Sequence, residues 1–407
     1  MDWQLVKRPM VAAAYAINVA VRARRGVRGR HWHEGSAREI VEACIDDCWD
    51  GTHYRASPGY FRQFWTRDLS FSTPSLARLS AQHRERAIGS FEWAIRTWER
   101  RKSHITTTIH FFDQPVDVFD YGVDCLPLLM AALARIEAEE LLEEHRPWLE
   151  GEVLHYLDEV VDPGTGMVRA DRKYSAHRDT VVNRCNAFGN SMVALLAMTL
   201  IDLGWDVPDS ILPLALAPQA ILMDQFWDRR GFFVDTPGDD RPSGEGNVWP
   251  FWSGVITDAS LLRQALDTLE AGGYANPYPL KYEPTRNAKI EPWFVRTFMP
   301  DYQGSTVWTS LGSMYLQLLH SIEPQRARPE IDRYISWIER DGTFWEVIDD
   351  ETGLRYSSTL LTRSDESMLW SAIFLDLLEN PSLPPATMRP VARQAGPETG
   401  SAPERDS

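Results

Sequence analysis

The sequence predicts an all-α fold, an (α/α)6 toroid in which six helical hairpins form a ring. Apolar residues recur at three- and four-residue spacings in about ten to twelve segments, which is the period of an amphipathic helix. Long aromatic or polar loops alternate with tight ones, and each long loop enters a helical segment. The long loops cover residues 52–70, 103–122, 168–186, 228–254, 274–303 and 341–363. An irregular helical bundle is the alternative.

The expected helices follow one another along the chain, separated by loops rich in Gly, Pro and Asp. They cover residues 37–49, 71–81, 84–101, 123–143, 147–160, 187–203, 209–226, 256–271, 304–321, 328–340 and 364–379. Strand patterns are short and scarce, as at Phe232–Val234. In such a ring the long loops are expected at one end, where they would form the site.

Three regions are expected along the chain. Residues 1–35 form an N-terminal helical extension, because the apolar run Met10–Val21 is too short to span a bilayer and lacks a clean cleavage site after it. An export signal or a peripheral anchor is the alternative for this run. Residues 36–380 form the barrel. Residues 381–407 are Pro-, Ala-, Glu- and Ser-rich without periodicity, so a disordered tail is expected.

Composition limits the class of partner. The 407 residues include 58 acidic and 42 basic side chains, and the net charge of −16 repels phosphate backbones, so nucleic acid is not expected. A neutral carbohydrate suits this charge, and 16 Trp residues suit carbohydrate clefts. The four cysteines lack a metal-site spacing and are expected as reduced thiols in a cytoplasmic protein without metal or cofactor. The oligomeric state stays open.

The stretch from Tyr60 to Phe71 predicts a sugar site. Trp65 offers a flat apolar face that can stack on a sugar ring. Asp68 can accept two hydroxyl hydrogen bonds, and Arg67 can hold that carboxylate in place. The alternative is an ordinary loop with an Arg–Asp ion pair and a buried Trp.

Two acids suit glycosidic bond hydrolysis, which needs one protonated and one ionised carboxyl group. Asp124 stands at the opening of an apolar helix, where desolvation favours the protonated form, so it is the predicted acid. A role as helix N-cap is the alternative. Glu346 is the predicted base, with Trp345 beside it as a subsite wall. A surface glutamate is the alternative there.

Further aromatic and polar side chains in or beside the long loops are predicted to contact substrate. They are Tyr121, Arg184, Trp249, Trp293, Gln303 and Trp308. The sequence has no Gly-x-Ser-x-Gly elbow and no Gly-rich phosphate loop, which argues against a serine hydrolase or a nucleotide-dependent enzyme.

Six motifs in order resemble those of the six-hairpin glycosidases. The nearest resemblance is to the alkaline/neutral invertases and to the group of trehalases, processing α-glucosidase I and mannosylglycerate-type hydrolases. The matching stretches are Trp65–Leu69 (W-x-R-D-F), Val123–Leu126 (V-D-S-G-L), Asn183–Asn190 (R-R-M-G-I-Y-G-H), Gly246–Trp249 (G-N-L-W), Tyr302–Trp308 (Y-H-N-G-G-S-W) and Phe344–Gly353 (W-P-E-Y-Y-D-x-x-T-G). Cys125 replaces a Ser and Gln303 a His, so sucrose specificity is not carried over.

The resemblance implies an inverting, exo-acting glycoside hydrolase that acts on a short α-linked glucoside or related oligosaccharide. Asp124 would be its acid and Glu346 its base, and the W-x-R-D element would hold the terminal ring. One alternative is a sugar epimerase or lyase on the same toroid, with His177, His110 and Tyr174 as proton carriers. Another is a catalytically inactive carbohydrate-binding protein.

Overall fold

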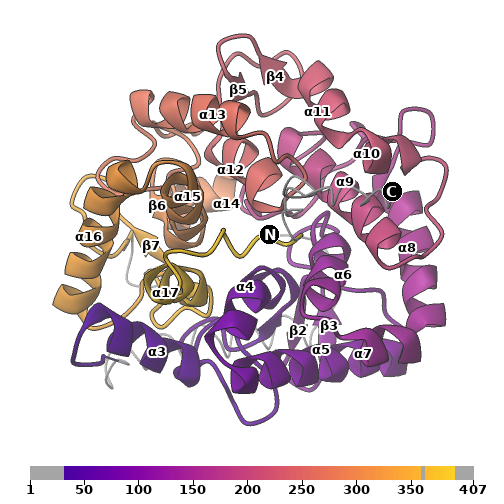
Figure 1. Cartoon of the computed structure of the whole chain (residues 1–407), viewed down its shortest axis with the longest axis horizontal. Helices are drawn as coiled ribbons and strands as arrows, with labels where there is room; N and C mark the ends of the chain where they lie inside the picture. The colour runs from indigo at the N-terminus through magenta and orange to yellow at the C-terminus, as the bar shows by residue number, and fades with distance from the viewer. Residues whose placement is uncertain (1–31, 359–362, 390–407) are drawn as a thin grey trace, which may run out of the picture.

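Six helices form a closed inner ring in the computed structural model, which describes residues 32–358 and 363–389 (Figure 1). Each inner helix packs against the next, and the last returns to the first. In chain order they are α4 (Thr66–Leu79), α6 (Cys125–Arg135), α9 (Ala187–Asp202), α12 (Gly244–Trp252), α15 (Thr309–Ile322) and α17 (Ser371–Glu379). This ring confirms the predicted all-α toroid. The expected N-terminal extension lies outside the described residues, apart from positions 32–35.

An outer layer of helices surrounds this ring, and its members alternate with the inner helices along the chain (Figure 1). They are α3 (Ala37–Asp47), α5 (Ala81–Arg101), α7 (Glu139–Glu144), α8 (Arg146–Val160), α10 (Leu212–Leu216), α11 (Pro218–Phe226), α13 (Ala259–Ala271) and α16 (Pro324–Asp341). Outer helices bury one stripe only. In α16 the buried residues Ile331, Tyr334, Trp337 and Ile338 recur at three- and four-residue spacing. Within the described part of the chain, every helix is too short or too polar to cross a membrane.

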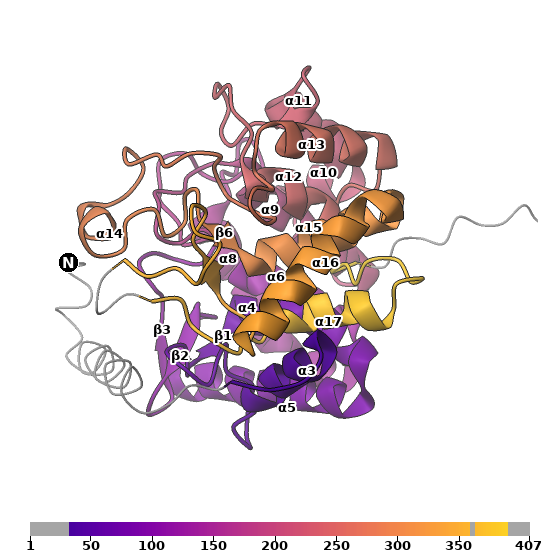
Figure 2. The same cartoon turned by 90° about the vertical axis from the view of Figure 1, so that its left-hand side faces the viewer.

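Several short strands and one small helix lie on one side of the ring (Figure 2). Strands β1 (Phe64–Trp65), β2 (Thr108–His110) and β3 (Gln114–Val116) form an antiparallel sheet. Strand β4 (Trp227–Asp228) pairs with β5 (Phe232–Phe233), and β6 (Val307–Trp308) pairs with β7 (Val347–Ile348). The small helix is α14 (Trp293–Phe298). Because β1 and β6 lead directly into α4 and α15, these strands fix the starts of two inner helices.

The inner helix α12 lies within the range 228–254, which was predicted to be a loop. All nine of its residues are buried, so it has no polar face and no amphipathic period that a sequence could display. It also contains Gly244, Gly246 and Pro250, which are poor helix formers. Ser243 starts the helix by accepting a hydrogen bond from the Gly246 amide at 3.1 Å. Tertiary burial therefore overrides local propensity at this position.

Part of the predicted tail packs against the barrel, at residues 384–389. Ala386 is 0% exposed and Met388 is 1% exposed. Arg78 at the end of α4 donates to the Pro384 carbonyl at 2.7 Å, and Arg135 at the end of α6 donates to the Thr387 carbonyl at 3.2 Å. Side-chain donors on inner helices therefore hold a segment whose own sequence is not periodic. Residues 390–407 lie outside the described range.

Helices α15 and α16 meet closely at Gly312. A Cβ atom at this position would lie 2.1 Å from the Tyr334 Oη atom and 2.3 Å from the Pro279 carbonyl oxygen. Tyr334 itself donates a hydrogen bond to that carbonyl. The absence of a side chain at residue 312 thus allows an inner helix, an outer helix and the 277–280 loop to meet.

We expect Gly312→Ala to lower the free energy of unfolding by ~1–3 kcal/mol, because the added methyl group has no space. Gly151→Ala on α8 is the matched control, since nothing lies within 4 Å of its added Cβ atom. That change should be neutral or stabilising by up to ~1 kcal/mol, because alanine favours a helix over glycine. Urea unfolding of both variants measures the difference. Equal effects of the two substitutions would contradict this packing.

Candidate active site

The N-terminal ends of the inner helices meet at the end of the ring that carries the short strands (Figure 2). At the start of α15, the Thr309 hydroxyl donates to the Trp345 carbonyl at 2.6 Å and accepts from the Trp370 indole at 2.9 Å. Trp370 is the residue just before α17. Each helix N-terminus carries a partial positive charge, so this end of the ring favours carboxylates. The positions of the helix N-termini therefore make this end of the ring the candidate site.

Arg67, in the first turn of α4, is the cation at the centre of this end. Its Nε lies 3.0 Å from Asp124 Oδ2, and its Nη2 donates to Asp124 Oδ1 at 3.1 Å. The same Nη2 donates to the Ser175 hydroxyl at 3.1 Å, and Nη1 donates to Asp179 at 3.3 Å. Burial alone would lower the pKa of this guanidinium, but the Asp124 and Asp179 charges outweigh burial and raise that pKa. Arg67 therefore stays charged and holds two aspartates.

Asp124 lies where the sequence predicted it, directly before α6. Its side chain is only 1% exposed, and both of its oxygens face Arg67. Although it occupies the N-cap position, its carboxylate caps no amide of α6. Two nitrogens of one guanidinium thus hold the two oxygens of this buried carboxylate. This environment suits an anchor for Arg67 better than a donor of protons.

Asp179 was not among the predicted catalytic residues, yet its surroundings suit an acid. Its side chain is 14% exposed, and a single Arg67 nitrogen contacts it. Burial raises the pKa of Asp179 to about 6, with the Asp124 charge adding to the rise and Arg67 opposing it. The sequence placed this residue only within the 168–186 loop. Its proximity to Arg67 and Asp124 comes from folding, so no local pattern could have identified it.

Asp68 and Trp65 form a polar and apolar pair next to Arg67. Burial raises the pKa of Asp68 to about 7, and the nearby Asp179 and Asp124 charges add to the rise. Within the described residues, no other residue donates a hydrogen bond to its carboxyl group. The half-buried Trp65 ring lies edge-on to Phe61 at 5.4 Å. A carboxyl group with free acceptor oxygens and an indole face are the two kinds of group that bind a sugar ring.

Glu346 lies beside the start of α15, far from the Arg67 group in sequence but at the same end of the ring. The Tyr302 hydroxyl donates a hydrogen bond to Glu346 Oε1, and the Asp365 amide donates to Oε2 at 3.0 Å. Glu346 as a whole is 2% exposed. These two donors fix the orientation of the buried Glu346 carboxyl at this end of the ring.

His177 and Gln303 join the Arg67 side of the site to the Glu346 side. Gln303, the neighbour of Tyr302, accepts from the Thr180 amide at 2.7 Å and donates to the His177 carbonyl at 3.2 Å. The His177 ring lies 5.3 Å from Trp249 and 6.5 Å from Trp308. Because Asp179 lies in the chain between His177 and Thr180, these contacts set its position relative to both sides.

The other predicted site residues divide into a buried and an exposed set. Trp249, Trp308 and Trp345 are nearly or fully buried, and Trp345 turns its indole N–H to Asp341 at 2.9 Å. Tyr121 is half-buried, 5.3 Å from the His104 ring. Arg184 is exposed and donates to the Ala170 carbonyl at 3.0 Å, which places it apart from the Arg67 group. Trp293 on α14 is 57% exposed.

Comparison with known proteins supports the fold on independent grounds. No protein-family model matches the chain, and no curated protein matches its sequence. A GH63 mannosylglycerate hydrolase from Thermus thermophilus, solved with Tris and D-glycerate, matches with a TM-score of 0.58 and 15% identity over 84% of this chain and 100% of that chain. A glycosidase variant in complex with glucose matches with a TM-score of 0.56 and 16% identity over 86% of this chain and 96% of that chain. These similarities confirm the predicted fold of the six-hairpin glycosidases.

Glu245, in the first turn of α12, is a buried acid that no counter-ion contacts among the described residues. It is 0% exposed, and neither of its carboxyl oxygens has a hydrogen-bond partner among the described residues. Burial raises the pKa of Glu245 to about 8, while the Arg178 charge opposes the rise. The folded protein therefore holds this carboxyl in its neutral form at neutral pH.

We expect this carboxyl to make the protein less stable as pH rises. Its folded pKa lies above the ordinary value of 4.5, so its contribution is complete below about pH 4.5 and is lost through about pH 8. Between pH 5 and 8.5, wild type should lose up to ~4 kcal/mol relative to Glu245→Gln, whose amide cannot ionise. Urea unfolding across this pH range measures the difference. Glu42→Gln at an exposed site is the control, and identical pH slopes in all three proteins would contradict the assignment.

Proposed function

We propose that the protein is an inverting, exo-acting glycoside hydrolase for a short α-linked glucoside or related oligosaccharide. Glu346 is its general base and Asp179 its general acid. One observation supports this assignment above the others: Arg67 binds Asp124 with two nitrogens but Asp179 with one. Only the second carboxyl combines exposure to the site with a pKa of about 6.

In this reaction Asp179 gives its proton to the glycosidic oxygen as the bond to the anomeric carbon breaks. A water molecule attacks that carbon from the opposite face and gives its proton to Glu346. The oxygen of water remains on the sugar, so the anomeric configuration inverts. Room for this water requires carboxyl groups about 6.5–9.5 Å apart. The Tyr302 hydroxyl orients the Glu346 carboxyl through its hydrogen bond to Oε1.

This proposal moves the acid role away from Asp124, the residue that the sequence favoured. Desolvation at the mouth of α6 was expected to keep Asp124 protonated. The structure instead places both of its oxygens against the buried Arg67. Asp124 then acts as a positioning residue: it fixes Arg67, and Arg67 fixes Asp179. The carboxyl of Asp68 and the ring of Trp65 would bind the terminal sugar.

The substrate class rests on the site and on the neighbours in fold. A buried floor of His177, Phe71 and Trp249 closes the ring beneath the carboxylates, which favours attack at a chain end. One structural neighbour is a mannosylglycerate hydrolase solved with D-glycerate, and another neighbour was solved with glucose. D-glycerate and glucose are small molecules, which is in line with a short saccharide as substrate. Four free cysteines agree with the proposed cytoplasmic location.

The alternative of a sugar epimerase or lyase finds no support in the three proton carriers that it requires. Burial lowers the pKa of His177 to about 3 and that of His110 to about 4. The Tyr174 hydroxyl donates to the Glu159 carbonyl at 3.1 Å, and burial raises its pKa to about 12. These groups are poorly matched to proton transfer at neutral pH.

A glycoside panel tests the proposed hydrolysis. The panel comprises sucrose, trehalose, isomaltose, maltose, glucosylglycerate and mannosylglycerate, with products followed by proton NMR. We expect two products from at least one α-linked member, with the β-anomer of the released sugar formed first. A single isomeric product would indicate an epimerase. Sugar binding without turnover across the panel would indicate a binding protein.

Substitution of the base tests its role on the substrate found in that panel. Glu346→Gln should reduce kcat by on the order of a thousandfold or more, because no group then accepts the proton of water. Glu351→Gln, an exposed change in the same loop, is the matched control and should retain wild-type turnover. Near-normal turnover in a folded Glu346→Gln protein would remove this residue from the role.

Tyr302 is expected to tune the base. Tyr302→Phe removes a hydrogen bond to a charged carboxylate, which contributes ~1.5–3 kcal/mol. The acidic limb of the kcat/KM pH profile should therefore move upward by about one pH unit or more. Tyr356→Phe is the control, since the Tyr356 hydroxyl donates to the Pro300 carbonyl at 2.7 Å. An acidic limb that stays in place in Tyr302→Phe, or moves equally in both variants, would refute this role.

A further inference from the structure

A pocket of about 200 Å³ lies among the C-terminal ends of inner helices, whereas the candidate active site lies at their N-terminal ends. The pocket is formed by the C-terminal ends of α4 and α6 and by the start of α5. Its lining residues are Pro74, Ala77, Arg78, Arg84, Arg135, Ile136 and Glu137. Three guanidinium groups therefore line one small cavity in a protein whose net charge is −16.

The three guanidinium groups mainly bind neutral acceptors. Arg84 donates to the Ile136 carbonyl at 2.6 and 3.0 Å, at the end of α6. Arg78 donates to the Pro384 carbonyl at 2.7 Å and reaches Asp376 at 3.4 Å. Carbonyl groups satisfy N–H donors, but each helix C-terminus offsets only part of one positive charge. Among the described residues, two carboxyl groups, those of Asp376 and Glu137, act on these arginines, so the arginines outnumber the carboxyl groups.

Arg135 is the guanidinium with the most unused capacity. Its Nε donates to the Thr387 carbonyl at 3.2 Å, whereas no described residue accepts a hydrogen bond from its two terminal nitrogens. Burial lowers the pKa of Arg135, and the charge of Arg78 lowers it further. An anion between Arg78 and Arg135 would offset both effects and use the free donors.

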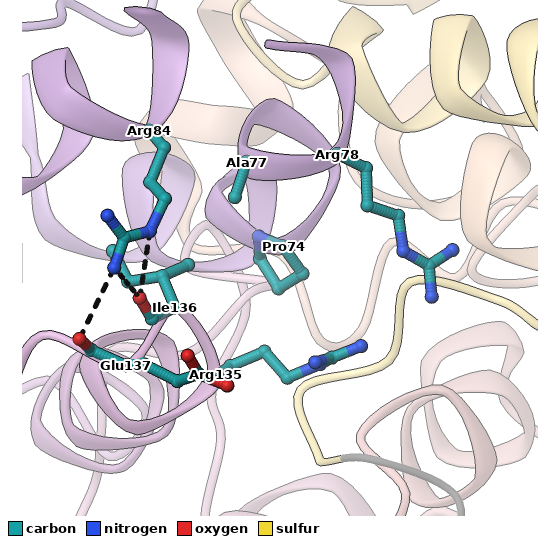
Figure 3. Close-up of a pocket in the computed structure, with 7 residues that line it drawn as sticks. All are labelled: Pro74, Ala77, Arg78, Arg84, Arg135, Ile136 and Glu137. Carbon is teal, nitrogen blue, oxygen red and sulfur yellow. Dashed lines mark hydrogen bonds between the residues drawn. The ribbon is translucent and has the colours of Figure 1, made fainter. Parts of the chain in front are cut away.

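The shape of the pocket limits the class of anion. Arg84 lies on one side of the cavity, and Arg78 and Arg135 lie on the other (Figure 3). A phosphate group offers acceptor oxygens in several directions, so it can bind donors that come from different helices. Pro74, Ala77 and Ile136 give the wall an apolar part, which can pack against carbon atoms of a small organic body.

We propose that this pocket binds the phosphate group of a small molecule between Arg78 and Arg135. The inference is independent of the proposed hydrolase function, because none of the lining residues belongs to the catalytic end. Arg78 and Arg135 also hold residues 384–387, so the bound phosphate would contact the side chains that fasten this segment.

Calorimetric titration of the full chain at low ionic strength tests the proposal. The probes are inorganic phosphate and a hexose phosphate, with the neutral hexose as the control for binding at the catalytic end. We expect both phosphates to bind, and saturating hexose should not displace them. Equal affinities would identify free phosphate as the occupant, whereas tighter hexose phosphate binding would show that the apolar wall contributes. If neither phosphate binds at a concentration of about 10 mM, the proposal is overturned, because a weaker affinity would be no more than non-specific.

Substitution locates the site. Arg135→Gln should weaken phosphate binding by at least about tenfold, because it removes one charge and two free donors. Arg169→Gln is the matched control, since Arg169 likewise donates to a backbone carbonyl, that of Asp158 at 2.9 Å. Arg135→Lys keeps the charge and provides an intermediate result if the glutamine variant fails to fold. Unchanged affinity in either folded Arg135 variant, or phosphate found elsewhere in crystals of the wild type, would overturn the assignment.

Discussion

The ion pair between Arg67 and its two aspartates is the interaction on which the rest of the site depends. A buried guanidinium requires buried counter-charges, and here α6 supplies one and the loop before α9 supplies the other. The cation contacts Asp124 with two nitrogens and Asp179 with one, and burial raises the pKa of Asp179 to about 6. Two residues of the same type are thus suited to different roles by the different contacts that they make.

The helical ring gives this interaction its place. Inner helices such as α9 and α12 are buried along almost their whole length, so polar groups gather in the loops at their two ends. The N-terminal ends attract carboxylates through the helix dipole. Strands β1 and β6 lead into α4 and α15, so they set where Arg67 and Trp308 stand. The C-terminal ends carry the complementary charge, and arginines gather there around the carbonyl groups of α6 and of residues 384–387.

The sequence predicted the ring and much of the site because those features are local. Helical periodicity marked the amphipathic outer helices, and the aromatic approach to Arg67 and Asp68 marked the start of α4. The helix α12 was missed because a helix buried on all sides has no period to detect. The acid role proposed for Asp179 was not predicted, because its partner Arg67 lies 112 positions away in the chain and a local motif does not show that contact. Arg184 lies in a conspicuous stretch of sequence, yet the fold turns it to the surface.

The acid role of Asp179 is tested most directly by two substrates, one whose leaving group needs a proton and one whose leaving group does not. Fluoride departs from a glycosyl fluoride without a proton, whereas the leaving sugar of a disaccharide needs one. We predict that Asp179→Asn loses on the order of a thousandfold in kcat on the disaccharide but stays within about tenfold of wild type on the fluoride. Asp124→Asn should lose activity on both, because it releases Arg67. The reverse pattern, with fluoride hydrolysis preserved in Asp124→Asn and lost in Asp179→Asn, would contradict the account.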